Sequence, residues 1–246
     1  MKVGIGIATF NRPIAFGQCL ESVLENAPDS AYLYVSDDGS DLDYGDSFSA
    51  LEPLGVKLFR GEHSNIATSK NRLLQAMMDD GVDHLFVIED DIRVLHPDAF
   101  VRPIEGCERY GMNHTMFAHH GSRNSMVEEG SFFSYHYECV GAFCYYSRKA
   151  IFEVGLMDTH FHNAFEHVVH TMLIGDAGLM PGARWRRFPD VVGSTMTLEE
   201  LDVPSSHLVT SEEDHMKKEH VQSALRYWKE HYRFPSDVEP LLLKES

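Results

Sequence analysis

Three adjacent carboxylates, Glu89, Asp90 and Asp91, follow an apolar run over residues 85–88. A short run of this kind is typical of a buried strand, so the carboxylates are expected where that strand ends, beside the core. Anions at the edge of a core are costly unless a cation or strong donors compensate them. A divalent ion shared between such carboxylates and the phosphates of a substrate would compensate them. The alternative is a solvated acidic turn that leads into the helix after Pro97.

Polar residues also follow two other predicted strands, near the N-terminus. They are Thr9, Asn11 and Arg12 after the strand over 3–9, and Asp37 and Asp38 after the strand over 31–35. A helix predicted between these strands makes a βαβ unit, which implies a parallel sheet. Ligands of such sheets bind at the carboxyl ends of the strands, which is where these polar groups fall. The Asp-Asp-Gly-Ser run alone is equally typical of a structural Asx turn.

Hydrophobic periodicity predicts further elements as far as residue 178. Helices are predicted over 41–54, 65–80, 97–110, 148–154 and 163–178, and strands over 56–59, 114–118 and, as one or two strands, 132–146. A last helix is predicted from about 211 to 232, packed against the domain rather than lying on a membrane. The predicted fold class is therefore α/β, Rossmann-like, with a mostly parallel central sheet flanked by helices.

Composition limits the classes of function. The chain has 246 residues, of which 43% are apolar, enough for one globular domain with or without an appendage. Its formal charge of -17 disfavours a primary role on nucleic acid, which needs clustered Lys and Arg. No apolar run has the length of a transmembrane helix, and Met1-Lys2 leads directly into a strand without a signal peptide. Four scattered cysteines without a CxxC pair favour a reduced, cytoplasmic protein.

Five motifs over residues 1–180 together resemble those of the GT-A glycosyltransferases, especially the inverting enzymes of family 2. The motifs are Thr9-x-Asn11-Arg12-Pro13; Asp37-Asp38-Gly39-Ser40; Asn65 with Lys70-Asn71; Glu89-Asp90-Asp91-Ile92 with Pro97-Asp98; and Gly141-Ala142-Phe143 with Val154-Gly155, Met157-Asp158, Phe161, Glu166-His167 and Gly178. The acidic triplet is similar to a Glu-Asp-Asp variant of the DxD motif. It looks most like the form found in the N-acetylglucosaminyltransferases that initiate complex glycan branches.

The resemblance implies a role for each matching residue. The nucleotide-binding residues would be Thr9, Asn11, Arg12, Asp38, Asn65, Lys70 and Asp90. Asp38 would accept a hydrogen bond from the base, and Lys70 would face the nucleotide or its phosphates. Asp91 would hold a divalent ion, Mn²⁺ or Mg²⁺, that bridges the diphosphate. His207 is the candidate for a further metal ligand.

The catalytic base is where the chain departs from the family pattern. The family's Glu-Asp pair is replaced by Glu166-His167, and either side chain could take a proton from an acceptor hydroxyl. Imidazole titrates close to neutral pH without help, whereas a glutamate needs a raised pKa to act well. We slightly favour Glu166, because a carboxylate one position away could take over the task. The alternative is that transfer activity has been lost.

The resemblance implies a GT-A domain over residues 1–195, with a nucleotide-binding half over 1–95 and an acceptor half over 96–195. Residues 196–246 would form a helical extension. The implied activity is metal-dependent transfer of a sugar from a nucleotide-diphosphate donor, with UDP-sugars favoured, to an acceptor hydroxyl with inversion. The alternatives are a non-catalytic nucleotide-sugar-binding module, or a glycosyltransferase that acts on modified DNA bases. The sequence identifies neither the sugar nor the acceptor, which could be a glycan, a protein or a small molecule.

Overall fold

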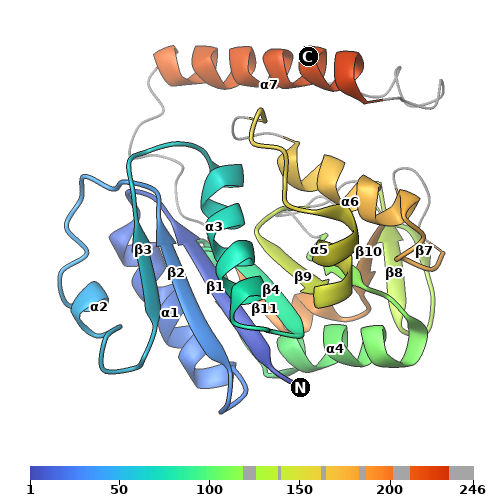
Figure 1. Cartoon of the computed structure of the whole chain (residues 1–246), viewed down its shortest axis with the longest axis horizontal. Coiled ribbons are helices and arrows are strands. Elements are labelled where there is room, and N and C mark those ends of the chain that lie inside the picture. Colours follow the sequence, from blue (N-terminus) through green and yellow to red (C-terminus); the bar gives the residue numbers. More distant parts are fainter. Residues whose placement is uncertain (119–125, 138–139, 162–164, 183–186, 202–210, 233–246) are drawn as a thin grey trace.

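A central six-stranded sheet organises the computed structural model of the chain (Figure 1). The structure describes residues 1–246 except 119–125, 138–139, 162–164, 183–186, 202–210 and 233–246. In spatial order the strands are β3 (Lys57–Arg60), β2 (Tyr32–Asp37), β1 (Val3–Thr9), β4 (His84–Glu89), β9 (Phe143–Ser147) and β6 (His114–Met116). The first four strands are parallel, and β9 runs antiparallel to both of its neighbours. The predicted mostly parallel α/β sheet is confirmed.

Helices cover both faces of this sheet (Figure 1). One face packs against α1 (Pro13–Asn26) and α4 (Asp98–Tyr110). The other packs against α3 (Ile66–Asp79), α5 (Arg148–Val154) and α6 (Glu166–Asp176). The polar edge of the sheet is thereby left between two helical layers, at the carboxyl ends of the parallel strands.

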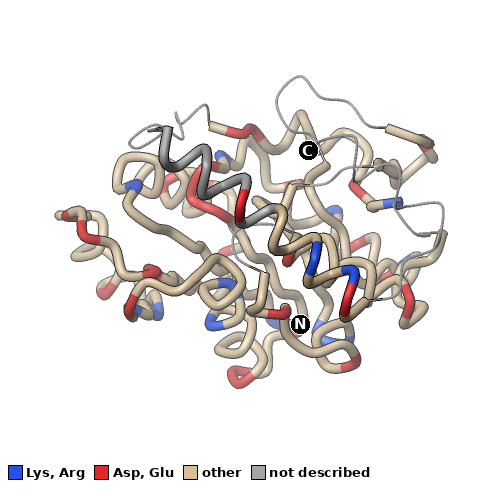
Figure 2. The backbone as a smooth tube through the Cα atoms, turned by 90° about the horizontal axis from the view of Figure 1, so that it is seen from above, with Lys and Arg blue, Asp and Glu red and all other residues tan. Residues whose placement is uncertain are grey.

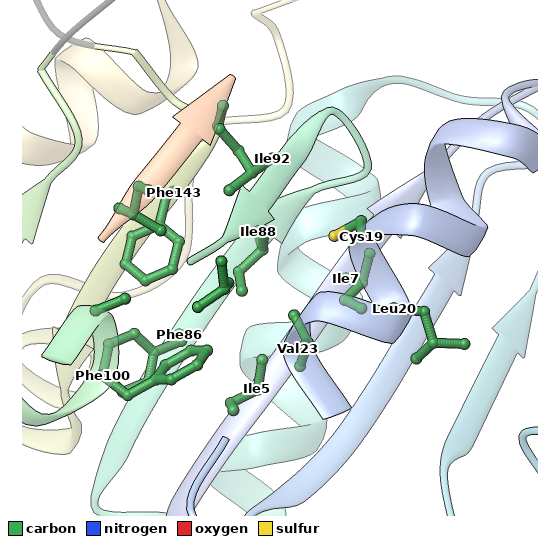
Figure 3. Close-up of a cluster of buried hydrophobic side chains, with 14 of the residues drawn as sticks. Ile5, Ile7, Cys19, Leu20, Val23, Phe86, Ile88, Ile92, Phe100 and Phe143 are labelled. Carbon is green, nitrogen blue, oxygen red and sulfur yellow. The ribbon is translucent and has the colours of Figure 1, made fainter. Parts of the chain in front are cut away.

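Strand β4 shows why the sheet strands read as continuous apolar runs. Phe86 and Ile88 point to the side of α1 and α4, where Figure 3 shows them in one buried cluster. Leu85 and Val87 point to the other side and pack with α3. All four side chains are fully buried, because successive residues of a strand face opposite helical layers.

Smaller elements complete the body of the molecule. They are a three-stranded antiparallel sheet of β10 (Phe188–Val191), β8 (Phe133–His136) and β7 (Met126–Glu129), the pair β5 (Ile92–Val94) and β11 (Leu198–Glu200), the short helix α2 (Asp46–Ser49), and the 3-10 turn η1 (Ser194–Met196). β5 pairs in antiparallel register with β11. Residues 198–200 are thus paired with the body of the molecule, and the predicted division of the chain at residue 195 stays a prediction.

One prediction about local structure differs from what is observed. The helix expected over 41–54 is reduced to the four residues of α2, because Gly45 and Gly55 take positive φ angles and turns replace the helix. The aromatic run over 132–146 forms two strands that belong to different sheets, β8 and β9. Strand β5 was not predicted. Three of the four cysteines lie in the described ranges, and these three are free thiols.

The C-terminal helix α7 (Ser211–His231) lies across one side of the body, the side from which Figure 2 is viewed. Its residues Ala224, Leu225 and Trp228 are buried against Phe161 and Val169. The helix is therefore packed on the domain, as the sequence analysis preferred. In the ranges that the structure describes, no helix combines the length and the apolar content needed to cross a membrane.

Helix α3 packs directly on the glycines of β1, and this contact leads to a stability prediction. A Cβ added at Gly6 would lie 3.0 Å from Leu73 Cβ, and a strand at the centre of the sheet has little freedom to move away. We expect Gly6→Ala to lower the free energy of unfolding by about 1–3 kcal/mol through overpacking. Urea denaturation monitored by circular dichroism measures this difference.

Gly17 provides the matched control, because it lies inside α1 and an added Cβ would come no closer than 3.6 Å to Ser47 Oγ. Gly17→Ala should raise the free energy of unfolding by about 0.5–1 kcal/mol, since alanine favours a helix. A Gly6→Ala variant as stable as Gly17→Ala would contradict the direct packing of α3 on β1.

Candidate functional site

The polar ends of three neighbouring strands meet at Thr9. The Asp38 backbone N–H donates to Thr9 O over 3.1 Å, and the Thr9 hydroxyl donates to Asp90 Oδ2 over 2.6 Å. The Asp90 backbone N–H also donates to Ala8 O over 3.1 Å. These contacts arise because β1 lies between β2 and β4, so that their carboxyl ends are adjacent. Thr9, Asp38 and Asp90 thus lie close together, and their contact with a nucleotide stays a prediction.

Arg12 is the cation that faces the acidic triplet. Its Nη1 lies 2.8 Å from Asp91 Oδ2 and 3.2 Å from Asp90 Oδ1. The Asp90 side chain is only 2% exposed, whereas Asp91 is 21% and Arg12 37% exposed. Two neighbouring carboxylates, one deeply buried, therefore share a single guanidinium that also borders solvent. The alternative prediction, that the acidic triplet is a solvated turn, is therefore wrong for Asp90 and Asp91.

The pKa values in this cluster show that its negative charge is incompletely compensated. Burial raises the pKa of Asp90 to about 7, although Arg12 and the Thr9 hydroxyl act in the opposite direction. Burial and the neighbouring Glu89 carboxylate raise the pKa of Asp91, again against the influence of Arg12. Asp91 Oδ1 is buried, and no described residue donates a hydrogen bond to it. A second cation at this cluster would lower the free-energy cost of burying these carboxylates.

The donor set fits a divalent ion that takes part of its shell from a substrate. Across the described ranges, no group of three or more His, Cys, Asp or Glu side chains is arranged to hold a metal ion. An ion at Asp91 would therefore complete its shell with phosphate oxygens and water, which is how Mg²⁺ and similar ions are commonly bound. The predicted ligand His207 lies outside the described residues.

Tyr44 organises this corner and was missed by the sequence analysis. Its hydroxyl lies 2.7 Å from Thr9 Oγ1 and accepts from the Arg12 backbone N–H over 3.1 Å. Its ring is buried against Phe16 and stacks on Phe48. A lone tyrosine in a segment expected to be helical gave no signal, because Thr9 and Arg12, the site residues that its hydroxyl contacts, are more than 30 residues away in the sequence.

Asp38 is buried and fully engaged with the loop before α3. Its carboxylate accepts from the Ser64 hydroxyl over 2.6 Å and the Ser64 backbone N–H over 3.1 Å. His63 Nδ1 lies 3.0 Å and Arg72 Nη1 3.3 Å from its two oxygens. A base that reached Asp38 would have to replace one of these donors. The half-exposed His63 is the one that could most easily move.

The two predicted asparagines hold loops in place. Asn11 has a positive φ of 52°, and its Oδ1 accepts from the backbone N–H groups of Asp41 and Leu42. Asn65 caps α3 by accepting from the Thr68 backbone N–H over 2.8 Å, and its amide donates to Thr159 O over 3.2 Å. Their direct contact with a nucleotide stays a prediction.

Lys70 lies elsewhere than predicted. It was expected to face the nucleotide or its phosphates, but its side chain is completely buried. Its Nζ donates to Glu89 Oε1 over 2.6 Å, to Gly141 O over 3.0 Å and to Glu166 Oε1 over 3.3 Å. Burial alone would lower the pKa of Lys70, but the Glu89 and Glu166 carboxylates raise it above its ordinary value. The amine already has three acceptors in the protein, so it is a structural cation here.

Glu166 and His167 open helix α6 and continue the chain of contacts from Lys70. Glu166 Oε1 lies 3.0 Å from His167 Nδ1. The preceding Phe165 has a φ of 68°, a left-handed conformation that non-glycine residues rarely adopt. A Cβ at Gly141 would lie 2.7 Å from His167 Nδ1, so a glycine is required where strand β9 approaches this pair. The role of Gly141 was not predicted, although the motif that contains it was noticed.

The four residues Glu89, Lys70, Glu166 and His167, called the buried relay below, connect the two halves of the site. Glu89 precedes Asp90 directly, so one end of the buried relay adjoins the acidic cluster. The other end is His167, whose side chain is 18% exposed. The predicted metal ligand Asp91 thus lies two residues along the chain from a network of ion pairs that ends at the predicted base.

The fold of the chain is similar to the folds of several solved structures. The chain is similar to TarS from S. aureus (TM-score 0.57, 14% identity, 71% of this chain and 33% of that chain). It is similar to the mannosyltransferase PcManGT from Pyrobaculum calidifontis (TM-score 0.63, 13% identity, 99% of this chain and 68% of that chain). It is also similar to GalNAc-T7 (TM-score 0.60, 14% identity, 78% of this chain and 42% of that chain).

These similarities show that the chain has the GT-A fold, as the sequence resemblance implied. The chain spans 33% to 55% of the length of the TarS chains that it matches. The rest of each TarS chain lies outside the match. Neither a protein-family model nor a curated protein sequence matches the chain.

Proposed function

We propose that the protein is a metal-dependent glycosyltransferase that moves a sugar from a nucleoside diphosphate donor to an acceptor hydroxyl, with inversion at the sugar carbon. The observation that carries the proposal is the buried carboxylate pair Asp90 and Asp91 with its uncompensated charge. This pair lies at the carboxyl ends of the parallel strands, where ligands of such sheets bind.

The chain's own residues would divide the work at the donor. Asp91 would hold a divalent ion, Mn²⁺ or Mg²⁺, which when bound supplies positive charge to the departing diphosphate. Asp90, held by Thr9, would orient the ribose or the sugar. Arg12 would be released from Asp90 and Asp91 once the ion neutralises them, and its guanidinium could then pair with a phosphate.

Ligands of the similar structures support this class of donor. One TarS structure contains UDP, and another contains UDP-GlcNAc. PcManGT is in complex with GDP-Man and Mn²⁺, and GalNAc-T7 with UDP, GalNAc and Mn²⁺. We favour a uridine diphosphate sugar for this chain, because Asp38 matches the family residue that accepts a hydrogen bond from the base.

The competing proposal is a nucleotide-sugar-binding module without turnover, which the replacement of the family's Glu-Asp pair by Glu166-His167 makes worth testing. Action on modified DNA bases is the less favoured alternative, since the net charge of -17 opposes binding to a polyanion.

A thermal-shift panel of nucleoside diphosphates and their sugars, with and without Mn²⁺, tests the proposal. A ligand at 100 times its Kd should stabilise the native state by about 2.7 kcal/mol through mass action. We expect stabilisation by a diphosphate that depends on Mn²⁺, and release of free sugar from the matching donor. Binding without release supports the non-catalytic module, and no stabilisation by any member contradicts both.

A further inference from the structure

The hydrogen bond between Glu166 and His167 indicates which of the two residues acts as the base. We propose that His167 is the base that takes the proton from the acceptor hydroxyl, through its Nε2, and that Glu166 is a positioning residue. This inference rests on the proposed function and reverses the slight preference for Glu166 drawn from the sequence. Its basis is the geometry of the buried relay.

The first step concerns the tautomer of His167. Glu166 Oε1 lies 3.0 Å from His167 Nδ1, and an ionised carboxylate can only accept a hydrogen bond. Nδ1 must therefore carry the proton, so that the neutral imidazole has its lone pair on Nε2. A carboxylate that fixes the tautomer and orientation of an imidazole base is a recurrent arrangement in enzymes.

The second step concerns the charge of Glu166. Burial by itself would raise the pKa of Glu166, but the nearby His167 and Lys70 hold that pKa well below its ordinary range. Glu166 is only 3% exposed, and Lys70 Nζ lies 3.3 Å from the same oxygen. A carboxylate that binds protons so weakly is a poor general base, and an acceptor hydroxyl cannot reach a side chain that is covered by protein.

The third step concerns access. The His167 side chain is 18% exposed, in contrast to Glu166. Among the described residues, none forms a hydrogen bond with His167 Nε2. His167 rather than Glu166 is thus the member of the pair that borders solvent, and Nε2 is its ring nitrogen that does not contact Glu166.

The surroundings of His167 come from several elements. The charged groups are Glu166 on its own helix, Lys70 on α3 and Glu89 on β4. Burial keeps two neighbouring histidines neutral by lowering the pKa of His114 on β6 to about 3 and the pKa of His170 to about 4. Burial also raises the pKa of the Cys144 thiol on β9 to about 12, which keeps it protonated. The Glu166 carboxylate, in direct contact with Nδ1, is the anion that would face the imidazolium during the reaction.

The proposed step balances in atoms and charge. The acceptor oxygen forms a bond to the anomeric carbon while its proton moves to His167 Nε2. The bond from that carbon to the diphosphate oxygen breaks, and its electron pair leaves with the diphosphate. His167 ends as an imidazolium next to the Glu166 carboxylate and later returns its proton to water.

The first test reads the tautomer directly and needs no substrate. Long-range ¹H–¹⁵N spectra of the full chain, in which His167→Gln identifies the signal by its loss, report which ring nitrogen of His167 is protonated. We expect the Nδ1–H tautomer at pH 8, and its loss as the dominant form in Glu166→Gln. An Nε2–H tautomer in the wild type would overturn the proposal.

The second test uses donor hydrolysis, in which water replaces the acceptor. His167→Gln should reduce the rate by about 10²–10⁴-fold, with an unchanged thermal shift by the nucleoside diphosphate and Mn²⁺. Glu166→Gln should reduce the rate less than His167→Gln does, because the imidazole remains but its tautomer and orientation are no longer fixed. His96→Gln, an exposed histidine outside the site, is the matched control and should leave the rate unchanged.

The outcomes separate this inference from the proposed function. If the wild type binds and hydrolyses a donor but His167→Gln retains the rate, the assignment of the base fails and the proposed function survives. A wild type that binds the donor without hydrolysing it also overturns the assignment. If no nucleotide binds, the proposed function fails, while the tautomer still decides whether the pair is arranged as a base and its positioning residue.

Discussion

Replacement of Lys70 by methionine is expected to lower the free energy of unfolding by about 3–5 kcal/mol. Methionine matches the length of the lysine stem but leaves the Glu89 and Glu166 carboxylates without their shared cation. A buried charge that loses its partner keeps its full desolvation cost, which exceeds the value of an ordinary contact. Urea denaturation at pH 7 measures the loss.

Lys57→Met is the matched control, because Lys57 also pairs with a carboxylate, that of Asp80 at 2.6 Å, but is 54% exposed. Solvent screens such a pair, so its loss should cost less than about 1 kcal/mol. Adding Glu166→Gln to Lys70→Met should recover part of the loss, since one unpaired anion is removed. Equal effects of Lys57→Met and Lys70→Met would contradict the buried position of Lys70.

The loss caused by Lys70→Met should also depend on pH, with a definite sign. In the wild type, the folded state holds the pKa of Glu166 below its ordinary value of 4.5, so this group stabilises the fold above that pH and loses its effect in acid. Without Lys70 the pKa of Glu166 rises, and protonation removes the unpaired charge. The difference between wild type and Lys70→Met should therefore shrink as the pH falls through the raised pKa of Glu166 in the variant, because the unfolded-state pKa is the same in both proteins.

Asp91→Asn is expected to abolish the Mn²⁺-dependent part of the thermal shift and to reduce donor hydrolysis by at least about 10²–10³-fold, the range found when one charge-stabilising contact is removed from an active site. Asparagine keeps the shape of the side chain but loses the charge that an ion needs. Asp83→Asn at the opposite end of β4, where Asp83 is half-exposed, is the matched control and should leave both readouts unchanged.

The same substitution should not destabilise the protein without ligands. Burial and Glu89 raise the pKa of Asp91, so the folded state favours its protonated form and stability falls as the pH rises through that pKa. At neutral pH, Asp91→Asn should equal or exceed the wild type in free energy of unfolding, and its advantage should grow as the pH rises above about 3.8, the ordinary pKa of an aspartate. A marked destabilisation would mean that Asp91 serves the fold through Arg12 rather than an ion.

The sequence was sufficient where the signal is local. A buried strand reads as an apolar run that ends in polar residues, and for this reason the positions of Thr9, Asp38 and Asp90 could be predicted. Their convergence followed from the βαβ order, because parallel strands place their carboxyl ends on one edge. The GT-A fold followed from the order of the motifs, none of which is specific alone.

The partners of buried polar groups could not be predicted in this way. Nothing near Lys70 in the sequence shows that its amine meets Glu89 and Glu166, which are 19 and 96 residues away. Tyr44 likewise contacts Thr9 and Arg12 only in the folded chain, because 35 and 32 residues separate it from them in the sequence. The prediction of a helix over 41–54 was wrong for a related reason. Turns with positive φ at two glycines replace most of that helix.

The buried relay also has an evolutionary consequence. Its four positions come from three distant segments of the chain, and each side chain satisfies a charge or proton on the next. Replacement of one residue leaves the charge of its neighbour unpaired. Such a replacement would therefore be selected against until a second replacement removes or pairs that charge. Descendants of a common ancestor should therefore retain this quartet intact or exchange several of its members together, and a designer who transplants the site would need to move all four.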